Sequence, residues 1–431
     1  MSGVDFLDKL LDLSAEQAGG VEVEWKALGD VAQYVRGLIY NKSSESTDGQ
    51  GYKVLRANNI TLTGNSLNFN DVKTVNFDTK VKNSQKLYKN DIFISAASGS
   101  REHVGKVAFI DTDIDFYFGG FMGVVRCGDK LLPRFLFHVL TSDIFQKYLD
   151  EMLNSSTINN LNSTVMGQFQ IPIPCPENSK KSLEIQAEIA RILDAFTELT
   201  AELTAELTAR KKQYNHYRDQ LLRFEDGEVE WKTLGEVANI QRGASPRPIA
   251  KYITDEQDGV PWIKIGDTSP GSKYVTSTNQ KITIEGAKSS RILNNGDFIM
   301  SNSMSFGRPY ILGIRGAIHD GWASISGFGD RLNSDYLYHY LSSNAVKIYW
   351  EGKINSSSVS NLNADIIKGL PIPIPSLSKQ KRIASILDKF DALTNSITEG
   401  LPREIALRQQ QYEYYRDLLL SFPKPESKVT A

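Results

Sequence analysis

The sequence has little cysteine and no long apolar run, and these two shortages narrow its class. Among 431 residues only Cys127 and Cys175 are cysteines, and their spacing matches neither a zinc site nor a disulfide framework. We therefore expect a reducing, cytoplasmic compartment. No apolar run reaches the roughly 18 residues of a membrane span. The opening residues, MSGVDFLDKLLDL, lack the basic start and cleavage site of a secretion signal, so no membrane partner is expected.

An excess of charge of one sign is also missing. The chain has 49 Lys and Arg against 51 Asp and Glu, a net charge of −2. This balance neither favours nor excludes nucleic acid, because a basic surface can coexist with acidic residues elsewhere. A hydrophobic content of 40% and a charged content of 23% are typical of a globular protein. The length predicts two or three domains.

Signatures of catalysis are weak. The loop Gly99–Lys106 differs from a phosphate-binding loop in its spacing and in having Val107 where Ser or Thr is needed. No glycine-rich nucleotide fingerprint opens a βα unit, and the Asn/Asp-Pro-Pro-Tyr/Phe motif of amino-methyltransferases is absent. Glu351-Gly-Lys353 and two Glu-Trp-Lys triplets fit half of a nuclease signature, without a supporting Asp on a neighbouring strand. We expect no catalytic residue, no metal and no cofactor in this chain.

What the sequence does contain is an internal repeat. Residues 22–37 and 228–243 are identical at eleven of sixteen positions, including Glu-Val-Glu-Trp-Lys and a closing Arg-Gly. The segments that follow this first match, residues 38–130 and 244–330, share little. We therefore expect two domains with a shared framework and different cores. The later matching anchors are Phe135–Leu140 with Tyr336–Leu341, Thr157–Asn162 with Ser358–Asn363, Ile171–Pro174 with Leu370–Pro373, and Ile189–Phe196 with Ile383–Phe390.

The ends of the halves correspond as well. Asp219–Phe224 resembles Asp417–Phe422, and Asp8–Leu13 is a weaker third copy. We therefore expect an N-terminal helix that packs near the C-terminal one and completes a body with pseudo-two-fold symmetry.

Strand-like runs and helical stretches alternate within each half. Strands are predicted over Asp91–Ser95, Lys106–Ile110 and Gly296–Met300. Helices are predicted over Pro133–Glu151 and Ser334–Glu351. Each half therefore reads as a mixed α/β globule of roughly 150 residues.

A long helix is predicted over Leu183–Phe224, because apolar residues recur at coiled-coil spacing from Ile185 to Leu203 and again from Tyr214. At about 1.5 Å per residue it is roughly 60 Å long, which suits a spacer. A tandem Thr-Ala-Glu-Leu repeat interrupts the heptads as a stutter, with Thr200 and Leu203 in one unit and Thr204 and Leu207 in the next.

A second long helix is predicted over Lys379–Phe422, with a seam at Ile383, Ile386, Phe390, Leu393 and Ile397. Gly400 and Pro402 should kink or break it. The two seams most simply bury each other, with the helices antiparallel.

The expected fold class is α/β (α+β), with two pseudo-symmetric domains separated by two long antiparallel coiled-coil helices. The expected segments are an N-terminal helix (1–20), a first domain (21–177), a central spacer helix (178–226), a second domain (227–376), and a C-terminal spacer helix with its tail (377–431).

Two unlike readers on a fixed spacer describe a device that reads two targets a set distance apart. DNA is the natural ruler, because half-sites about 10 bp apart lie roughly 34–36 Å apart on one side of the duplex. Different cores imply two different half-sequences, and hence an asymmetric bipartite site.

The order of these motifs along the whole chain resembles the specificity subunit of type I restriction–modification enzymes, and the Thr-Ala-Glu-Leu tandem resembles a subfamily that carries such units. The resemblance implies that the chain recognises DNA and directs adenine methylation or cleavage by partner subunits. These partners would be two methyltransferase subunits docked on the helices, and restriction (motor and nuclease) subunits. S-adenosylmethionine, ATP and Mg²⁺ would serve the partners.

Candidate contacts to double-stranded DNA are basic, amide and aromatic residues in the divergent domains, because such side chains read base edges or bind phosphates. A solvated surface charge is the alternative for each of them. In the first half they are Arg36, Tyr40, Lys42, Lys53, Arg56, Asn58 and Asn59, with Arg101 and Lys106 in the loop Ser98–Lys106; in the second half they are Arg242, Arg247, Lys251, Lys264, Lys288, Arg291, Ser303 and Arg308.

Other prominent residues have structural interpretations that we favour. Trp25 and Trp231 offer platforms for a base, but an anchor that packs the domain onto the helices is favoured. Expected core or turn residues are His138, His339, Tyr214, Tyr217, Tyr412, Tyr415, Asn160–Asn162 and Asn361–Asn363.

Two alternatives stay open at this point. A coiled-coil scaffold that bridges DNA would need no enzyme partner, and co-purification of a methyltransferase would argue against it. A self-standing nuclease would cleave DNA alone with Mg²⁺.

Overall fold

The computed structural model describes most of the chain, and the chain divides into two compact units. The described residues are 21–61, 64–98, 101–154, 160–225, 227–269, 271–302, 307–355, 362–396 and 398–423. Unit 1 comprises residues 1–200 and 408–431, and unit 2 comprises residues 201–407. The helix expected over residues 1–20 lies outside the described residues.

The predicted long helix is α6 (Ser179–Leu221), with 43 residues. It begins four residues before the predicted start, where the Asn178 carboxamide accepts a hydrogen bond from the amide of Lys181 (3.1 Å). At 1.5 Å per residue it is about 65 Å long. Its first half belongs to unit 1 and its second half to unit 2.

The second long helix is broken, as Gly400 predicted. It consists of α12 (Leu377–Asn395) and α13 (Gly400–Leu419). Gly400 has a φ of 77°, and a Cβ added there would lie 2.4 Å from the carbonyl oxygen of Ala392. Only glycine fits this turn.

Within unit 2, α6 and α12 run antiparallel. The rings of Tyr214 and Tyr217 stack on Phe390 near one end of the pair. Lys379, near the start of α12, lies 5.0 Å from the ring of Phe224, just beyond the end of α6. The predicted direction is therefore confirmed by contacts inside this unit.

Part of the predicted seam is wrong. In α12 the buried apolar residues are Ile383, Ala384 and Leu387. Of the predicted seam, Ile386 is 37% and Leu393 36% exposed, and Ile397 lies outside the described residues. The buried stripe of α12 lies on the side that packs against α9 (Ser334–Leu341), one helical step from the predicted line. Tyr217 was predicted to be core and is 39% exposed.

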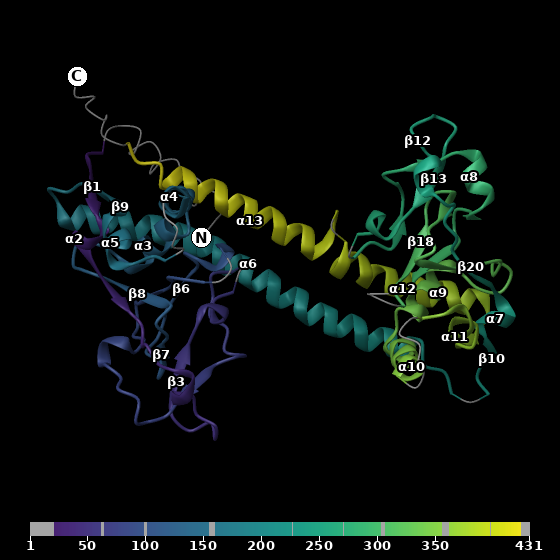
Figure 1. The fold of residues 1–431 in the computed structure, drawn as a ribbon, viewed down its shortest axis with the longest axis horizontal. Helices are drawn as coiled ribbons and strands as arrows, with labels where there is room; N and C mark the ends of the chain where they lie inside the picture. Colours follow the sequence, from purple (N-terminus) through teal and green to yellow (C-terminus); the bar gives the residue numbers. More distant parts are fainter. Residues whose placement is uncertain are drawn as a thin grey trace. The chain divides into compact units, whose positions relative to one another are not determined.

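Unit 1 is built on a four-stranded antiparallel sheet of order β2-β8-β5-β6, of which Figure 1 labels β6 and β8. Ile92 and Ile94 of β5 face the larger core and Phe93 a smaller one, so this strand is buried on both faces. The predicted strands at 91–95 and 106–110 are confirmed as β5 and β6. The four strands are β2 (Ala32–Arg36), β5 (Ile92–Ser95), β6 (Val107–Phe109) and β8 (Met122–Cys127).

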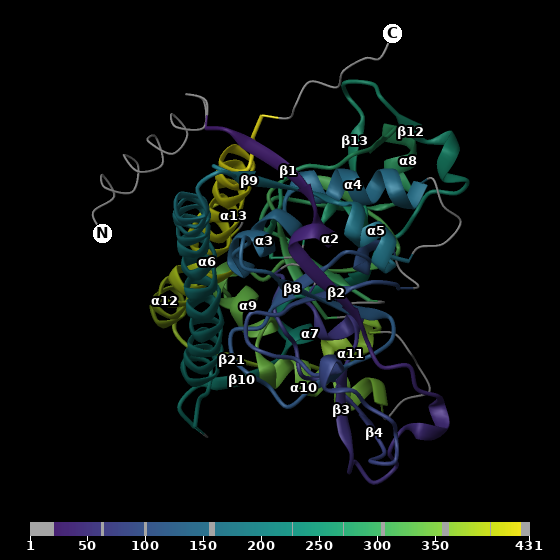
Figure 2. The same ribbon diagram turned by 90° about the vertical axis from the view of Figure 1, so that its left-hand side faces the viewer.

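A smaller sheet of order β4-β3-β7 also belongs to unit 1. It lies at the end of unit 1 away from the last turns of α13 (Figures 1 and 2). Its strands are β3 (Tyr52–Leu55), β4 (Lys73–Val75) and β7 (Tyr117–Phe118).

Unit 2 contains two five-stranded sheets. The first, of order β11-β20-β17-β18-β14, corresponds to the main sheet of unit 1 with one strand added. That strand, β14, pairs parallel with β18 and has no counterpart beside β6 in the described part of unit 1. The first sheet consists of β11 (Asn239–Arg242), β14 (Tyr274–Val275), β17 (Phe298–Ser301), β18 (Pro309–Leu312) and β20 (Trp322–Ser326).

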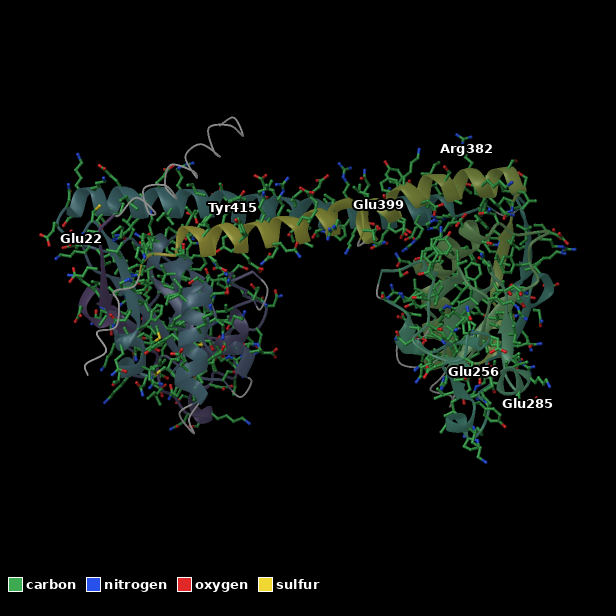
Figure 3. All side chains as sticks on the ribbon, turned by 90° about the horizontal axis from the view of Figure 1, so that it is seen from above. Glu22, Glu256, Glu285, Arg382, Glu399 and Tyr415 are labelled. Carbon is green, nitrogen blue, oxygen red and sulfur yellow. The ribbon has the colours of Figure 1, made fainter. Side chains whose placement is uncertain are left out.

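The second sheet of unit 2 carries α8 (Ile284–Lys288) beside it. Figure 3 shows Glu256 and Glu285 of this region at the end of unit 2 opposite to Arg382 of α12. Its strands are β12 (Ile253–Thr254), β13 (Val260–Ile263), β15 (Lys281–Ile282), β16 (Arg291–Leu293) and β19 (Gly316–Ile318).

The single helices predicted over Pro133–Glu151 and Ser334–Glu351 are each two helices in the structure. In unit 1 the break follows Leu140, where the hydroxyls of Thr141 and Ser142 donate to the carbonyls of His138 and Val139 (3.0 and 2.7 Å). These bonds satisfy the last turn and end the helix. The helices are α3 (Pro133–Leu140), α4 (Asp143–Asn154), α9, and α10 (Asn344–Asn355).

The repeated Glu-Trp-Lys segments form strands that pair with the proline-rich segments. In unit 1, β1 (Val23–Ala27) is antiparallel to β9 (Gln170–Pro174), with Trp25 opposite Pro172. In unit 2, β10 (Glu230–Thr233) pairs in the same way with β21 (Pro371–Ile374). Proline suits such two-stranded ribbons because every strand is an edge. Short helices flank the ribbons: α2 (Leu28–Val31), α5 (Ser163–Gln168), α7 (Leu234–Val237) and α11 (Ala364–Lys368).

Candidate nucleic-acid interface

Five candidate residues of the first half converge on one hollow of unit 1, which we call the first concave surface. It is about 850 Å³ in volume and lies where β2 ends, next to the turn that precedes β8. The candidates that line it are Arg36, Tyr40, Lys42, Arg56 and Asn58.

The repeated Arg-Gly pair forms the base of this surface. The Arg36 guanidinium donates to the carbonyl of Gly120 (3.3 Å) and to Asn160 Oδ1 (3.4 Å). A Cβ added at Gly37 would lie 2.0 Å from the carbonyl oxygen of Gly119. Glycine is therefore required for the close approach of the two backbones.

An acidic residue orients two of the candidates. Asp71 Oδ2 accepts from Arg56 Nη2 (2.7 Å) and from Asn58 Nδ2 (2.6 Å). Asp71 was not predicted, because a carboxylate is not expected on a surface that binds an anion. Asn59 is a correction: it is 0% exposed and its carboxamide donates to the carbonyls of Asn68 and Asp71, so it is a core residue.

Two apolar side chains on the same surface were also missed. Ile39 is 87% and Phe121 73% exposed, and both line the hollow with the basic residues. Exposed apolar residues look the same in a sequence as buried ones, so no sequence signal distinguished them. Exposed apolar groups among cations suit a partner with both charge and apolar edges.

The remaining candidates of the first half lie elsewhere. The Lys53 ammonium lies 5.6 Å from the ring of Phe116. Lys106 is half-buried at the start of β6, where its carbonyl accepts from the amide of Ser95. The side chain of Arg101 lies outside the described residues.

In unit 2, Arg247 and Lys264 line a second hollow, the second concave surface, about 710 Å³ in volume. Asp320 also lines it, accepting from Ser245 Oγ (3.0 Å) and from Arg247 Nη2 (3.2 Å). Burial acts to raise the pKa of Asp320, but the Ser245 hydrogen bond and the nearby cations hold it below its ordinary value. The carboxylate therefore stays charged and oriented.

Arg242 repeats the role of Arg36. Its Nε donates to the carbonyl of Asp320 (3.1 Å), and a Cβ at Gly243 would lie 2.1 Å from the carbonyl oxygen of His319. Both Arg-Gly pairs thus support the turn that precedes an equivalent strand, β8 or β20.

The other candidates of the second half do not gather at the second concave surface. Arg308 lines a separate hollow of unit 2, together with Lys211, Arg218 and Lys347. Ser303 lies outside the described residues. Three exposed basic side chains near the second sheet complete the set: Lys251, Lys288, which pairs with Glu285 at 2.8 Å, and Arg291.

The residues interpreted as structural lie mostly as predicted. Asn162 and Asn363 each accept from the third residue of the following helix and cap it. Trp25 donates from Nε1 to the carbonyl of Pro423 (2.8 Å), whereas Trp231 is 45% exposed. His138 and His339 are completely buried.

Neither a metal site nor a membrane-spanning helix is found in the part of the chain that the structure describes. There, no group of three or more His, Cys, Asp and Glu side chains could hold a metal ion. The described helices include none that is both long and apolar enough to cross a membrane.

Comparison with known proteins assigns the chain to a family of DNA specificity proteins. The family description "Type I restriction modification DNA specificity domain" matches residues 20–210 and 227–407. The chain is 37% identical over 444 aligned residues to the specificity subunit of the Escherichia coli type I restriction enzymes EcoR124I/EcoR124II, covering 99% of both chains.

Solved structures share the fold. A chain from a structure of assembly and conformational transition in a type I R-M system has a TM-score of 0.62 at 17% identity, covering 94% of this chain and 100% of that one. The S subunit from M. genitalium has a TM-score of 0.54 at 15% identity, covering 94% and 97%.

The two matched segments define a protein with two DNA specificity domains. The chain belongs to the type I restriction–modification DNA specificity family. It is a non-catalytic specificity subunit, which implies DNA and the other subunits of a restriction–modification complex as partners. The scaffold interpretation is not favoured.

Proposed function

We propose that this subunit recognises an asymmetric bipartite DNA site, with one half-site read by each unit. The observation that carries the proposal is the pair of concave surfaces, which follow the same Arg-Gly turn but are lined by different residues. A shared scaffold with different linings is what two different half-sequences require. The proposed recognition domains are residues 21–177 and 227–376.

On the first concave surface we assign the basic residues to phosphates and base edges, and the apolar pair to thymine. Lys42 suits a phosphate, whereas Arg56 and Asn58, oriented by Asp71, suit base edges. Ile39 and Phe121 are suited to the 5-methyl group of thymine, the only apolar group at the edge of a base pair in the major groove.

Residues 178–226 and 377–431 would set the unread spacer. One Thr-Ala-Glu-Leu unit advances a helix by about 6 Å and rotates it by about 40°. One base pair advances about 3.4 Å and rotates about 34–36°. Because the rotations nearly agree, one unit would account for one base pair of the spacer. The presence of the tandem at Thr200–Leu207 supports a place in the subfamily with such repeats.

The finer partner assignments follow from family membership. Two methyltransferase subunits would dock on the long helices and direct adenine methylation, and restriction subunits would join through them. S-adenosylmethionine, ATP and Mg²⁺ would act on those subunits, in the cytoplasm. No residue of this chain is proposed to react.

The test is site-dependent methylation by the chain together with its methyltransferase. Lys42→Ala should weaken binding to all sequences and reduce the slope of log affinity against log salt by about 1. Lys89→Ala, an exposed lysine of unit 1 that does not line the surface, is the matched control. Methylation that ignores sequence, or an unchanged salt slope in Lys42→Ala, would contradict the proposal.

A further inference from the structure

We propose that Lys273 is a positioning residue of the second recognition domain. The helices that the two halves share carry an ion pair in unit 1 but only carboxylates in unit 2, and Lys273 supplies the missing cation. It thereby fixes the recognition domain on α9 and α12. This inference rests on the proposed function and extends it from the residues that face DNA to the way their domain is held.

In unit 1 an ion pair joins the two helices α3 and α6. Asp194 of α6 accepts from Nε of Arg134 on α3 through both carboxylate oxygens (3.1 Å each) and lies 2.8 Å from His138 Nε2. The guanidinium lies 5.1 Å from the ring of Phe137. The repeated framework here provides both the carboxylate and the cation that neutralises it.

In unit 2 the charge at one of these positions is reversed. The repeat aligns Arg134 with Asp335 and Asp194 with Asp388. Two carboxylates therefore replace an ion pair, one on α9 and the other on α12. Unless a cation comes from elsewhere, the two negative charges repel each other.

Lys273 provides that cation. Its Nζ lies 2.6 Å from Oδ1 of Asp335 and 2.6 Å from Oδ1 of Asp388. It also lies 5.2 Å from the ring of Tyr338, the counterpart of Phe137. The ammonium thus takes the place of the Arg134 guanidinium, between the same acidic position and the same aromatic position.

The segment that carries Lys273 belongs to the divergent domain. Lys273 precedes β14, the strand without a counterpart in the described part of unit 1, and its carbonyl accepts from the amide of Ile311 on β18 (2.9 Å). A Cβ at Gly271 would lie 3.0 Å from the carbonyl oxygen of Asn395, so this segment passes close to the end of α12. One residue therefore joins the sheet edge to both framework helices.

The low exposure of Lys273 makes its contacts with the two carboxylates important for stability. The side chain of Lys273 is 12% exposed, and those of Asp335 and Asp388 are 34% and 39% exposed. Removing the shared cation leaves two half-buried carboxylates facing each other, which costs far more than losing an exposed pair. Methionine at position 273 keeps the length of the side chain but not its charge.

The first experiment measures unfolding of the full chain by tryptophan fluorescence. The signal reports mainly unit 2, because four of the five tryptophans are there and Trp262, Trp322 and Trp350 are buried. Lys273→Met should lower the unfolding midpoint by about 5 °C. Adding Asp335→Arg, which restores the charges of unit 1, should recover most of the loss. The control is Lys368→Met, which removes an exposed lysine–carboxylate pair of the same unit.

The second experiment measures DNA binding by the complex with methyltransferase subunits, using duplexes with either half-site scrambled. Lys273→Met should reduce discrimination at the second half-site several-fold and leave the first unchanged, and Asp335→Arg should restore it. An effect no larger than that of Lys368→Met, no rescue by Asp335→Arg, or equal loss at both half-sites would overturn the inference.

These experiments distinguish failure of the proposed function from failure of the role proposed for Lys273. If the wild-type complex shows no sequence-dependent binding, the proposed function fails while the unfolding rescue still tests Lys273. If the wild type reads both half-sites and the rescue fails, only the role of Lys273 is lost.

Discussion

The hydroxyl of Tyr412 lies 3.1 Å from Nδ1 of His138, although the two residues are 274 positions apart in the sequence. His138 Nε2 in turn lies 2.8 Å from Asp194. Unit 2 repeats the arrangement, with Tyr214 3.0 Å from His339 Nδ1 and Asp388 2.8 Å from its Nε2. A neutral imidazole satisfies both contacts if Nε2–H donates to the carboxylate and Nδ1 accepts from tyrosine.

These contacts predict equal roles for the two tyrosines. Tyr412→Phe and Tyr214→Phe should each cost about 1–2 kcal/mol of unfolding free energy, because a buried imidazole nitrogen loses its partner. Chemical denaturation of the full chain measures this, with Tyr414→Phe, 66% exposed, as control. No difference from Tyr414→Phe would contradict the assigned tautomer.

The buried His138 predicts a pH dependence of unit 1. Burial outweighs the attraction of Asp194 and lowers the pKa of His138 below its ordinary value. Below about pH 6.5 the unfolded chain therefore binds more protons than the folded chain, and stability falls as pH drops toward the folded-state pKa.

Hydrogen exchange of unit 1 between about pH 7.5 and 5.5 checks this. The wild type should lose stability more steeply than His138→Gln over that range. Parallel slopes for the two proteins would show that His138 does not titrate as argued.

The two Arg-Gly turns predict half-site-selective defects. Gly37→Ala and Gly243→Ala place a Cβ 2.0 and 2.1 Å from a carbonyl oxygen, and relief of such a clash costs roughly 1–3 kcal/mol. Gly37→Ala should impair only the first half-site and Gly243→Ala only the second, in binding assays with each half scrambled. The control is Gly329→Ala, because a Cβ there meets no atom within 4 Å.

The assignment of Ile39 and Phe121 to thymine predicts a methyl-group effect. Replacing thymine by uracil in the first half-site should weaken binding about four-fold per contacted methyl, from roughly 0.8 kcal/mol per buried group. In Ile39→Ala or Phe121→Ala one such effect should vanish, while uracil in the second half-site acts equally on all proteins. A wild type indifferent to uracil would remove the assignment.

The repeat allowed the framework to be predicted, because identical anchors must pack in equivalent ways. The break at Gly400 and the buried His138 and His339 followed from local rules about glycine, helix periodicity and apolar faces. The pairing of the Trp25 segment with a proline-rich strand was not predicted, since a short edge strand has no periodic signal of its own.

The candidate site was predicted in part for a physical reason. Tyr40 and Arg56 follow different strands, β2 and β3, but both line the first concave surface. Whether Asn59 faces solvent, or Arg308 lies at the second concave surface, depends on contacts between distant segments. The charge reversal at Asp335 was visible in the sequence, but its partner Lys273 lies in a segment with no counterpart to align.

The most direct test of the account inserts one Thr-Ala-Glu-Leu unit after Leu207 and maps methylated sites genome-wide in a host that also makes the methyltransferase. The account predicts two unchanged half-sequences separated by one more base pair, since the added turn of about 40° nearly matches one base-pair step. Unchanged spacing, or altered half-sequences, would contradict it.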